Sequence, residues 1–489
     1  MSVASNNDNT AHPSEVERLL GTTEHQEEQL TDSEGEDDFV KKYGDIKFQY
    51  IKRPKDALWF IRPHALNYFK EGVLYRTKGE RSSGKTELFL DLIYVGIIGK
   101  VAGEACEDAS WAALIKYILI FLPYWTVWAD IKDVTNYYYN EDLSQKLYLL
   151  WILVLLTTSV NAQQSVLEST KGAAFTIVPY ILCRLSLAFG LLFYSFFIPE
   201  HRAQQRLYFV FLLITNAIWV PVIFVGAKAK VVIALIAIAL EQITFSIVFH
   251  PYTKRLLKLT MSTALNIEHE VERMGAFYTV AIGEFLKTIT AESRIGVGFT
   301  KSYPRGILFL VIAYTLFWLY DGCGNCKKAV HPLRHSAFRA ISWIYLHVPL
   351  IGSVVLAANS GGELIGIQEH RIQWSRTTGE IEPHLDAYAL TLFFTGGLCV
   401  ALLSIYAIGS LDESRDAPGT FLVSKFWRVS WRLPAAIAIL ALGFLNIGIT
   451  AVMASTAAIL IALYFYESVV STPKRYLAFG EYFNGTAAN

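Results

Sequence analysis

The chain has 489 residues, of which 53% are hydrophobic, 14% aromatic and 18% charged, and its formal net charge is zero. A soluble protein would rarely contain repeated apolar runs of about 20 residues, the length that spans a bilayer as a helix. The composition therefore excludes an ordinary soluble domain and predicts an all-α, polytopic helical membrane bundle. The zero net charge itself says nothing about nucleic acid, and we expect the lipid bilayer as a partner and no nucleic acid.

The N-terminal segment, residues 1–44, is polar and acidic, so we expect a disordered tail. Its beginning lacks the apolar core of a signal peptide. Within it, Glu15, Leu19 and Leu20 fit an acidic dileucine sorting signal. This pattern predicts a sorting adaptor as a partner and a vacuolar or endolysosomal membrane, with the plasma membrane as the alternative.

The next segment, residues 45–85, mixes aromatic residues such as Trp59 and Tyr68 with basic ones. Two interpretations stay open here: an interfacial helix lying on the inner leaflet, or a folded cytoplasmic collar. Residues 79–86 also match the spacing of a nucleotide-binding P-loop. We interpret them as a basic juxtamembrane flank, because no soluble α/β pattern is present to build the sheet that a P-loop needs.

Residues 86–470 are predicted to form the transmembrane domain, with about twelve helices, and residues 471–489 a cytoplasmic tail. Asn446 and Gly448 suit a tight reversal between the last two helices. The apolar stretches lie at roughly 87–105, 111–129, 145–161, 173–198, 207–226, 231–250, 271–290, 306–322, 340–358, 387–410, 433–448 and 450–469.

The distribution of Lys and Arg predicts the orientation of these helices. Alternate loops, starting with the segment before the first helix, contain far more Lys and Arg than the opposite set. Because basic loops stay on the cytoplasmic side, we expect both termini in the cytoplasm. The sequon at Asn484 should then carry no glycan.

The stretch from 269 to 287 has an unusual pattern of ionisable residues inside an apolar helix. Five of them fall within an arc of about 120° over a length of about 27 Å. Charges at membrane depth are costly, so this stripe should face protein or water rather than lipid. The five residues are His269, Glu272, Arg273, Glu284 and Lys287.

The first apolar helix carries Glu87 and Asp91 four residues apart, which places both on one face. Asp91 is too short to reach the interface from its position inside the apolar run. Asp91, Glu87, Glu284 and His347 are therefore candidates for a polar pathway or an ion or proton site. His269, Glu272, Arg273 and Lys287 are candidates for a structural or gating charge network.

Further polar groups lie within predicted spans, among them Arg184 and Glu241. Together these groups would serve as a proton relay or cation path, or simply as contacts that hold helices together. The sequence does not say which of them meet. Asp130 and Asp133 follow the predicted end of the second helix, and we interpret them as part of an aromatic cluster at the interface.

One loop offers soft and borderline metal ligands at short spacing. Cys323, Cys326, His331 and His335 form the pattern C-x2-C-x4-H-x3-H, whose side chains are those that hold Zn²⁺. The spacing between the pairs is shorter than in common zinc fingers, so a solvated basic loop is the alternative. We expect no cofactor.

Three segments in the order of the chain resemble one family, the bacterial low temperature requirement A (LtrA) proteins and their fungal relatives. Residues 87–95 are similar to the opening ELFFDLVFV signature, although Leu90 replaces Phe. The pattern H-x-x-E-R-x-G followed by G-E is matched by His269, Glu272, Arg273, Gly275, Gly283 and Glu284. Residues 343–350 resemble the Y-x-H-x-P-L segment. The resemblance implies a polytopic membrane protein and adds weight to these residues, but implies no substrate.

We therefore expect a transporter or an ion- or proton-conducting protein that uses the intramembrane charges. The alternative is a non-transporting membrane receptor or scaffold in which the same charges form structural salt bridges. An enzyme is not expected, because no nucleophile–base pair or metal-ligand set lies within the spans. The sequence leaves substrate and oligomeric state open.

Overall fold

The structure, a computed structural model, describes residues 47–52, 58–77, 83–138, 142–290, 295–296, 298–322, 329–367, 387–417, 419–445 and 447–474. The chain divides into two compact units, Met1–Ile46 and Lys47–Asn489, and all described residues belong to the second. The predicted tail with its sorting signal, Cys323, Cys326 and Asn484 lie outside the described residues.

The N-terminal half of the second unit consists of six long helices. The polar Asp142 and Ser169 side chains cap the N-termini of the third and fourth by accepting hydrogen bonds from Gln145 N and Gly172 N. The six are α2 (Lys85–Asp108), α3 (Trp111–Tyr138), α4 (Leu143–Ala162), α5 (Thr170–Phe197), α6 (Arg202–Trp219) and α7 (Ala227–Phe249). The short helices are η1 (Gln163–Ser165), η2 (Pro221–Ile223) and α8 (Pro251–Leu256).

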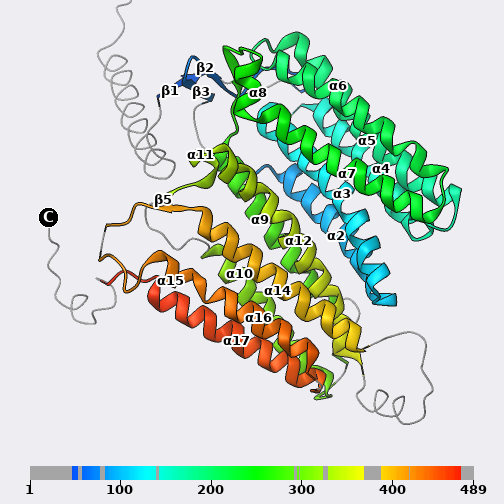
Figure 1. Cartoon of the computed structure of the whole chain (residues 1–489), viewed down its shortest axis with the longest axis vertical. Coiled ribbons are helices and arrows are strands. Elements are labelled where there is room, and N and C mark those ends of the chain that lie inside the picture. The colour runs from blue at the N-terminus through cyan, green and yellow to red at the C-terminus, as the bar shows by residue number, and fades with distance from the viewer. Residues whose placement is uncertain are drawn as a thin grey trace, which may run out of the picture. The chain divides into compact units, whose positions relative to one another are not determined.

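The described residues of the C-terminal half form six further main helices. They are α9 (Ile267–Thr290), α10 (Ser302–Asp321), α12 (Ala337–Gly366), α14 (Ala387–Leu411), α16 (Arg432–Phe444) and α17 (Ile449–Val470). Two shorter helices, α11 (Pro332–His335) and α15 (Lys425–Ser430), lie in the connections. Figure 1 shows α4–α7 on one side of this unit and α10, α14, α16 and α17 on the other.

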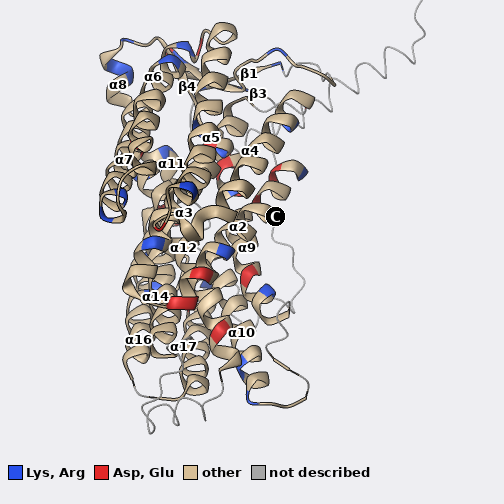
Figure 2. Ribbon diagram, turned by 90° about the vertical axis from the view of Figure 1, so that its right-hand side faces the viewer, with Lys and Arg blue, Asp and Glu red and all other residues tan. Residues whose placement is uncertain are grey.

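Each of the twelve predicted apolar stretches contains a helix. Within the described residues, nine helices are long and apolar enough to cross a membrane. The other three are α2 and α9, which carry several ionisable residues, and α16, which has only 13 residues. The chain is therefore a multi-pass helical protein, while twelve crossings stay a prediction. Figure 2 shows long stretches of helix without charge and a few charged positions in the middle of the bundle.

A small sheet, absent from the all-α expectation, combines three strands of the segment before α2 with one strand before α9. It has the order β1-β3-β2-β4, with β1 (Phe48–Ile51) parallel to β3 (Val73–Thr77) and β2 (Asn67–Lys70) antiparallel to both β3 and β4 (Met261–Thr263). Glu71 and Gly72, both with positive φ, form the two-residue turn of the β2–β3 hairpin. The described residues of this segment thus form strands and contain no helix before α2.

The sheet is fastened to α9 by a buried ion pair, and a separate two-stranded sheet lies elsewhere in the chain. Arg76 of β3 donates to both carboxylate oxygens of Glu268 in α9, at 3.3 and 3.0 Å. β5 (Ala329–Val330), which lies between α10 and α12, pairs antiparallel with β6 (Glu413–Ser414), which follows α14. β4 directly precedes α9, so the sheet marks the end of the bundle where α2 and α9 begin.

The two halves meet along α2 and α3 on one side and α9 and α12 on the other. One large apolar core runs through both halves. A second apolar cluster, which includes Tyr138 and Tyr208, lies where α3, α5, α6 and α7 approach the sheet. Buried ionisable side chains lie at the seam between the halves, inside the N-terminal half and, as the Arg432–Glu467 ion pair, between α16 and α17 of the C-terminal half.

Candidate functional site

The first cluster joins the beginnings of α2 and α9. His269 is fully buried, and its Nε2 lies 3.1 Å from Glu87 Oε1. Asn136 Nδ2 of α3 lies 3.2 Å from His269 Nδ1. Because the amide group donates to Nδ1, the ring proton resides on Nε2 and is donated to the carboxylate. The side chain of Asn136 also bonds both backbone groups of Asn266, which fixes the start of α9.

The second cluster lies one turn deeper along both helices. Arg273 Nη1 and Nη2 donate to Asp91 Oδ2 and Oδ1 at 2.6 and 2.7 Å, and both side chains are buried. Trp128 Nε1 of α3 donates to Asp91 Oδ1 at 2.9 Å, while its ring stacks on Phe277 with centroids 4.2 Å apart. The carboxylate therefore has three donors, and a bidentate charged pair of this kind is strong.

The third cluster joins α3 to α9. Lys132 Nζ donates to Glu270 and lies 3.1 Å from Asp133 Oδ1, so one ammonium group serves two carboxylates. Glu270 is fully buried, and its second oxygen, Oε2, accepts no hydrogen bond from the described residues. Lys132 lies one turn beyond Trp128 on α3, and Glu270 lies three residues before Arg273 on α9. The second and third clusters are therefore adjacent.

The fourth cluster lies inside the N-terminal half. Arg184 of α5 forms an ion pair with Asp130 of α3, and its Nε lies 3.8 Å from Glu241 Oε1 of α7. Glu241 also accepts hydrogen bonds from Tyr180 Oη at 2.7 Å and Trp219 Nε1 at 2.9 Å. Again one cation lies between two carboxylates.

A small cavity of about 40 Å³ is lined by residues of both the third and the fourth clusters, among apolar side chains. This volume is enough for at least one water molecule, and the site offers several polar partners to hold it. Its charged lining residues are Asp130, Lys132, Asp133, Arg184 and Glu241.

Glu284 lies apart from these clusters, near the other end of α9. Its carboxylate is 2% exposed and accepts a hydrogen bond at 2.7 Å from Lys287, whose side chain is 49% exposed. Asn359 Nδ2 of α12 lies 3.5 Å from the same oxygen, Oε1. Eleven residues separate Glu284 from Arg273, a rise of about 16 Å along the helix.

His347 of α12 is fully buried but forms a separate local contact. Its Nδ1 lies 2.8 Å from the Trp343 carbonyl oxygen and its Nε2 lies 3.0 Å from Tyr320 Oη. The ring therefore donates through Nδ1 and accepts through Nε2. The structure does not bring Glu284 and His347 together with Asp91 and Glu87, so the four residues predicted for a polar pathway do not form one site.

The predicted stripe on α9 also needs a correction. Glu272 is exposed and Lys287 is half exposed, so the five residues of the stripe are not sheltered together inside the protein. Glu268 and Glu270, which the stripe left out, are buried. Because α9 packs against α2, α3, α10 and α12, its buried surface is broader than one stripe and includes Glu268 and Glu270. Glu272 lies on the part of the helix surface that stays exposed.

The sequence missed the roles of Asp130, Lys132 and Asp133 because α3 is longer than its apolar run. The predicted helix ended at residue 129, but α3 continues to Tyr138 and carries these residues into the protein interior. The Asp-x-Lys-Asp pattern directly after an apolar run, together with Arg184 and Glu241 inside other runs, was the available signal.

The metal-site prediction falls only partly on described residues. His331 Nδ1 accepts a hydrogen bond from Leu333 N, and burial lowers the pKa of His331 to about 4. His335 Nε2 lies 2.5 Å from Glu413 Oε2. Within the part of the chain that the structure describes, no group of three or more potential metal ligands occurs. With Cys323 and Cys326 outside it, the zinc site stays untested.

The fold and these clusters define a class of protein: a multi-pass helical membrane protein with ionisable groups buried between its helices. The family model described as bacterial low temperature requirement A protein (LtrA) matches residues 82–466. The chain therefore belongs to the LtrA family. No curated protein and no solved structure matches it.

Proposed function

We propose that this protein conducts protons or a small cation across its membrane, or couples their movement to transport. The route would begin at Glu87 and His269, near the sheet. It would continue through the Asp91–Arg273 and Lys132–Glu270 clusters and reach Glu241. The supporting observation is the excess of acidic over basic side chains in the second, third and fourth clusters.

Those three clusters contain more carboxylates than permanent cations. Five acidic side chains face three basic ones: Asp91, Asp130, Asp133, Glu241 and Glu270 against Lys132, Arg184 and Arg273. Arg273 and Asp91 form a balanced pair, whereas Lys132 and Arg184 each lie between two carboxylates. An unbalanced buried negative charge costs several kcal/mol, on the order of the penalty for any unpaired ion in a protein interior.

The imbalance is removed when two protons or cations enter the network. The cavity beside Asp130, Asp133 and Glu241 would hold one of them, or a water molecule that carries a proton between clusters. The free oxygen of Glu270 is a second acceptor. A network that must exchange protons or cations to stay neutral is suited to conduction.

The test compares two glutamates of α9 that lie two residues apart. The full chain is reconstituted in liposomes, and a pH-sensitive dye records proton flux under an imposed gradient, with K⁺ and Na⁺ gradients measured separately. Glu270→Gln should lower the flux at least about tenfold, the usual scale for loss of a proton-transfer group. Lys132 keeps Asp133 as its partner, so folding should persist.

Glu272→Gln is the matched control, since this carboxylate is exposed on the same helix. Its flux should equal that of the wild type. Equal flux in the two variants, or no flux of H⁺, K⁺ or Na⁺ in the wild type, would overturn the proposal.

The second candidate is a non-transporting receptor or scaffold. The paired contacts across α2, α3 and α9 favour it, because Asp91 and Arg273 alone already form a balanced bond between helices. Absence of any ion flux from a well-folded protein is the outcome that supports this alternative.

We further propose twelve membrane crossings with both termini in the cytoplasm, in a vacuolar, endolysosomal or plasma membrane. The similarity to fungal LtrA relatives, the sorting adaptor and the absence of enzymatic activity also stay predictions. Glu284 and His347 are not part of the proposed route.

A further inference from the structure

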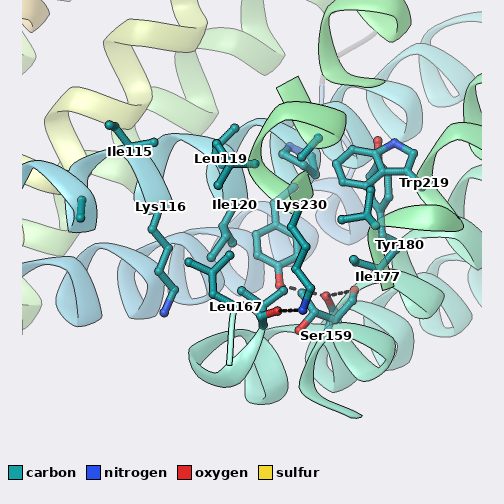
Figure 3. Close-up of a pocket in the computed structure, with 18 residues that line it drawn as sticks. Ile115, Lys116, Leu119, Ile120, Ser159, Leu167, Ile177, Tyr180, Trp219 and Lys230 are labelled. Carbon is teal, nitrogen blue, oxygen red and sulfur yellow. Dashed lines mark hydrogen bonds between the residues drawn. The ribbon is translucent and has the colours of Figure 1, made fainter. Parts of the chain in front are cut away.

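A large apolar pocket lies in the N-terminal half, between the ends of α3, α4, α5 and α7 that are remote from the sheet. Its volume is about 320 Å³, within the range of small-molecule sites. Figure 3 shows Leu119, Ile120 and Ile177 among its lining side chains. Ile115 also lines it and is 51% exposed on α3, a helix apolar enough to span the membrane. The pocket therefore opens on the side of α3 that would face lipid.

Two lysines accompany this apolar lining. Lys230 is only 5% exposed, and its Nζ donates to the Val166 carbonyl oxygen at 2.7 Å (Figure 3). Lys116 Nζ donates to the Gln164 carbonyl oxygen at 2.9 Å. The lining contains no acidic residue, and neither lysine forms an ion pair with a carboxylate among the described residues.

A buried ammonium group with a single carbonyl partner is costly unless an anion joins it. Lys230 is the fourth residue of α7 and Lys116 the sixth of α3, so both lie near helix ends, where headgroups occur. The pocket thus combines an acyl-chain environment with two cationic donors at the level of a headgroup.

We propose that this pocket binds an anionic phospholipid from the surrounding bilayer. One acyl chain occupies the apolar cavity, and the phosphate accepts hydrogen bonds from Lys116 and Lys230. Charge complementarity and the opening beside Ile115 identify a bilayer lipid as the occupant. The inference goes beyond the proposed ion conduction and does not depend on it.

The position of the pocket suggests what the lipid would influence. Tyr180 and Trp219 line the pocket and also donate the two hydrogen bonds that hold Glu241. An acyl chain in the pocket therefore contacts the side chains that support the last carboxylate of the buried network.

The test measures lipid retention by native mass spectrometry of the full chain in detergent. Phosphatidylglycerol and phosphatidylcholine with identical acyl chains are titrated separately. Two basic contacts predict a preference for phosphatidylglycerol of about 30-fold. The double variant Lys116→Met, Lys230→Met keeps the apolar stems and should lose this preference.

Two controls separate recognition from folding and from general surface charge. The double variant Lys116→Arg, Lys230→Arg should restore the preference. Lys228→Met, which removes an exposed lysine from the same turn of α7, should leave it unchanged. Equal retention of the two lipids by the wild type, or equal loss in the Lys228 variant, would overturn the proposal.

An inorganic phosphate arm tests whether the acyl chain matters. Phosphate at millimolar concentration should fail to displace phosphatidylglycerol, because it lacks the chain that fills the cavity. Full displacement would show that the lysines bind phosphate without the pocket, which contradicts the lipid assignment. Ion flux measured on the same variants reports separately on the proposed function.

Discussion

Asp91 of α2 and Arg273 of α9 join the two halves of the helical unit through two hydrogen bonds of 2.6 and 2.7 Å, with both side chains out of contact with solvent. Trp128 of α3 donates a third hydrogen bond to the same carboxylate. The consecutive helices α2 and α3 and the distant α9 are therefore fixed to each other by one carboxyl group.

Removing only the cation of the Asp91–Arg273 pair should lower the stability of the folded protein. Arg273→Met leaves Asp91 buried with Trp128 as its only donor among the described residues. We expect a loss of about 3–5 kcal/mol in the free energy of unfolding, measured by denaturant titration in detergent. The double variant Asp91→Asn, Arg273→Met should recover most of it, because the amide oxygen still accepts from Trp128. A double variant no more stable than Arg273→Met would contradict the pairing.

Close packing of α14 against α12 depends on Gly397. A Cβ built there would lie 2.8 Å from the Ser353 backbone oxygen, which cannot move without shifting α12. Gly397→Ala should therefore lower the free energy of unfolding by about 1–3 kcal/mol. Gly396→Ala is the control, since a Cβ at Gly396 meets nothing within 4 Å. Because alanine has a better helix propensity than glycine, Gly396→Ala should be neutral or stabilising by up to about 1 kcal/mol. Similar losses in both variants would argue against the helix contact.

His201, in the connection between α5 and α6, should make stability depend on pH. It is fully buried, its Nδ1 lies 2.9 Å from Tyr138 Oη, and its Nε2 lies 3.2 Å from the Asn67 carbonyl oxygen of β2. Burial, with a smaller contribution from Lys254, lowers the pKa of His201 to about 3. The unfolded chain therefore binds this proton more readily, so stability is retained above about pH 6.5 and decreases as the pH falls towards 3.

At pH 5 this loss should reach about 2 kcal/mol relative to pH 7.5, because each pH unit below 6.5 contributes about 1.4 kcal/mol. His201→Gln removes the titration and should show a smaller acid-induced decrease in thermal midpoint. Identical pH profiles for wild type and variant would exclude His201 as the cause.

The orientation predicted from basic loops is tested at Asn484. With a cytoplasmic C-terminus, this sequon should not be glycosylated. A tag on either terminus should be accessible to antibody only after the cytoplasmic face of the membrane is exposed. Glycan at Asn484, detected as a mobility shift removed by endoglycosidase, would reverse the assigned orientation.

The sequence alone determined where the helices lie and that some must bury charge. Apolar runs of bilayer length have few alternatives to the helix, since backbone groups in lipid need internal partners. Four-residue spacing likewise placed Glu87 with Asp91, and His269 with Arg273, on shared helix faces. Both features depend only on local periodicity.

Tertiary structure decided which charges meet. Lys132 finds Glu270 because α3 extends past its apolar run, and Glu272 points outward although it falls in the predicted arc. β4 joins a hairpin almost 200 residues earlier in the chain, which no local pattern indicated. Which buried charges form ion pairs depends on how helices from different parts of the chain are rotated and packed. The periodicity of one sequence predicts which face of a helix is buried, but not which helix packs against that face.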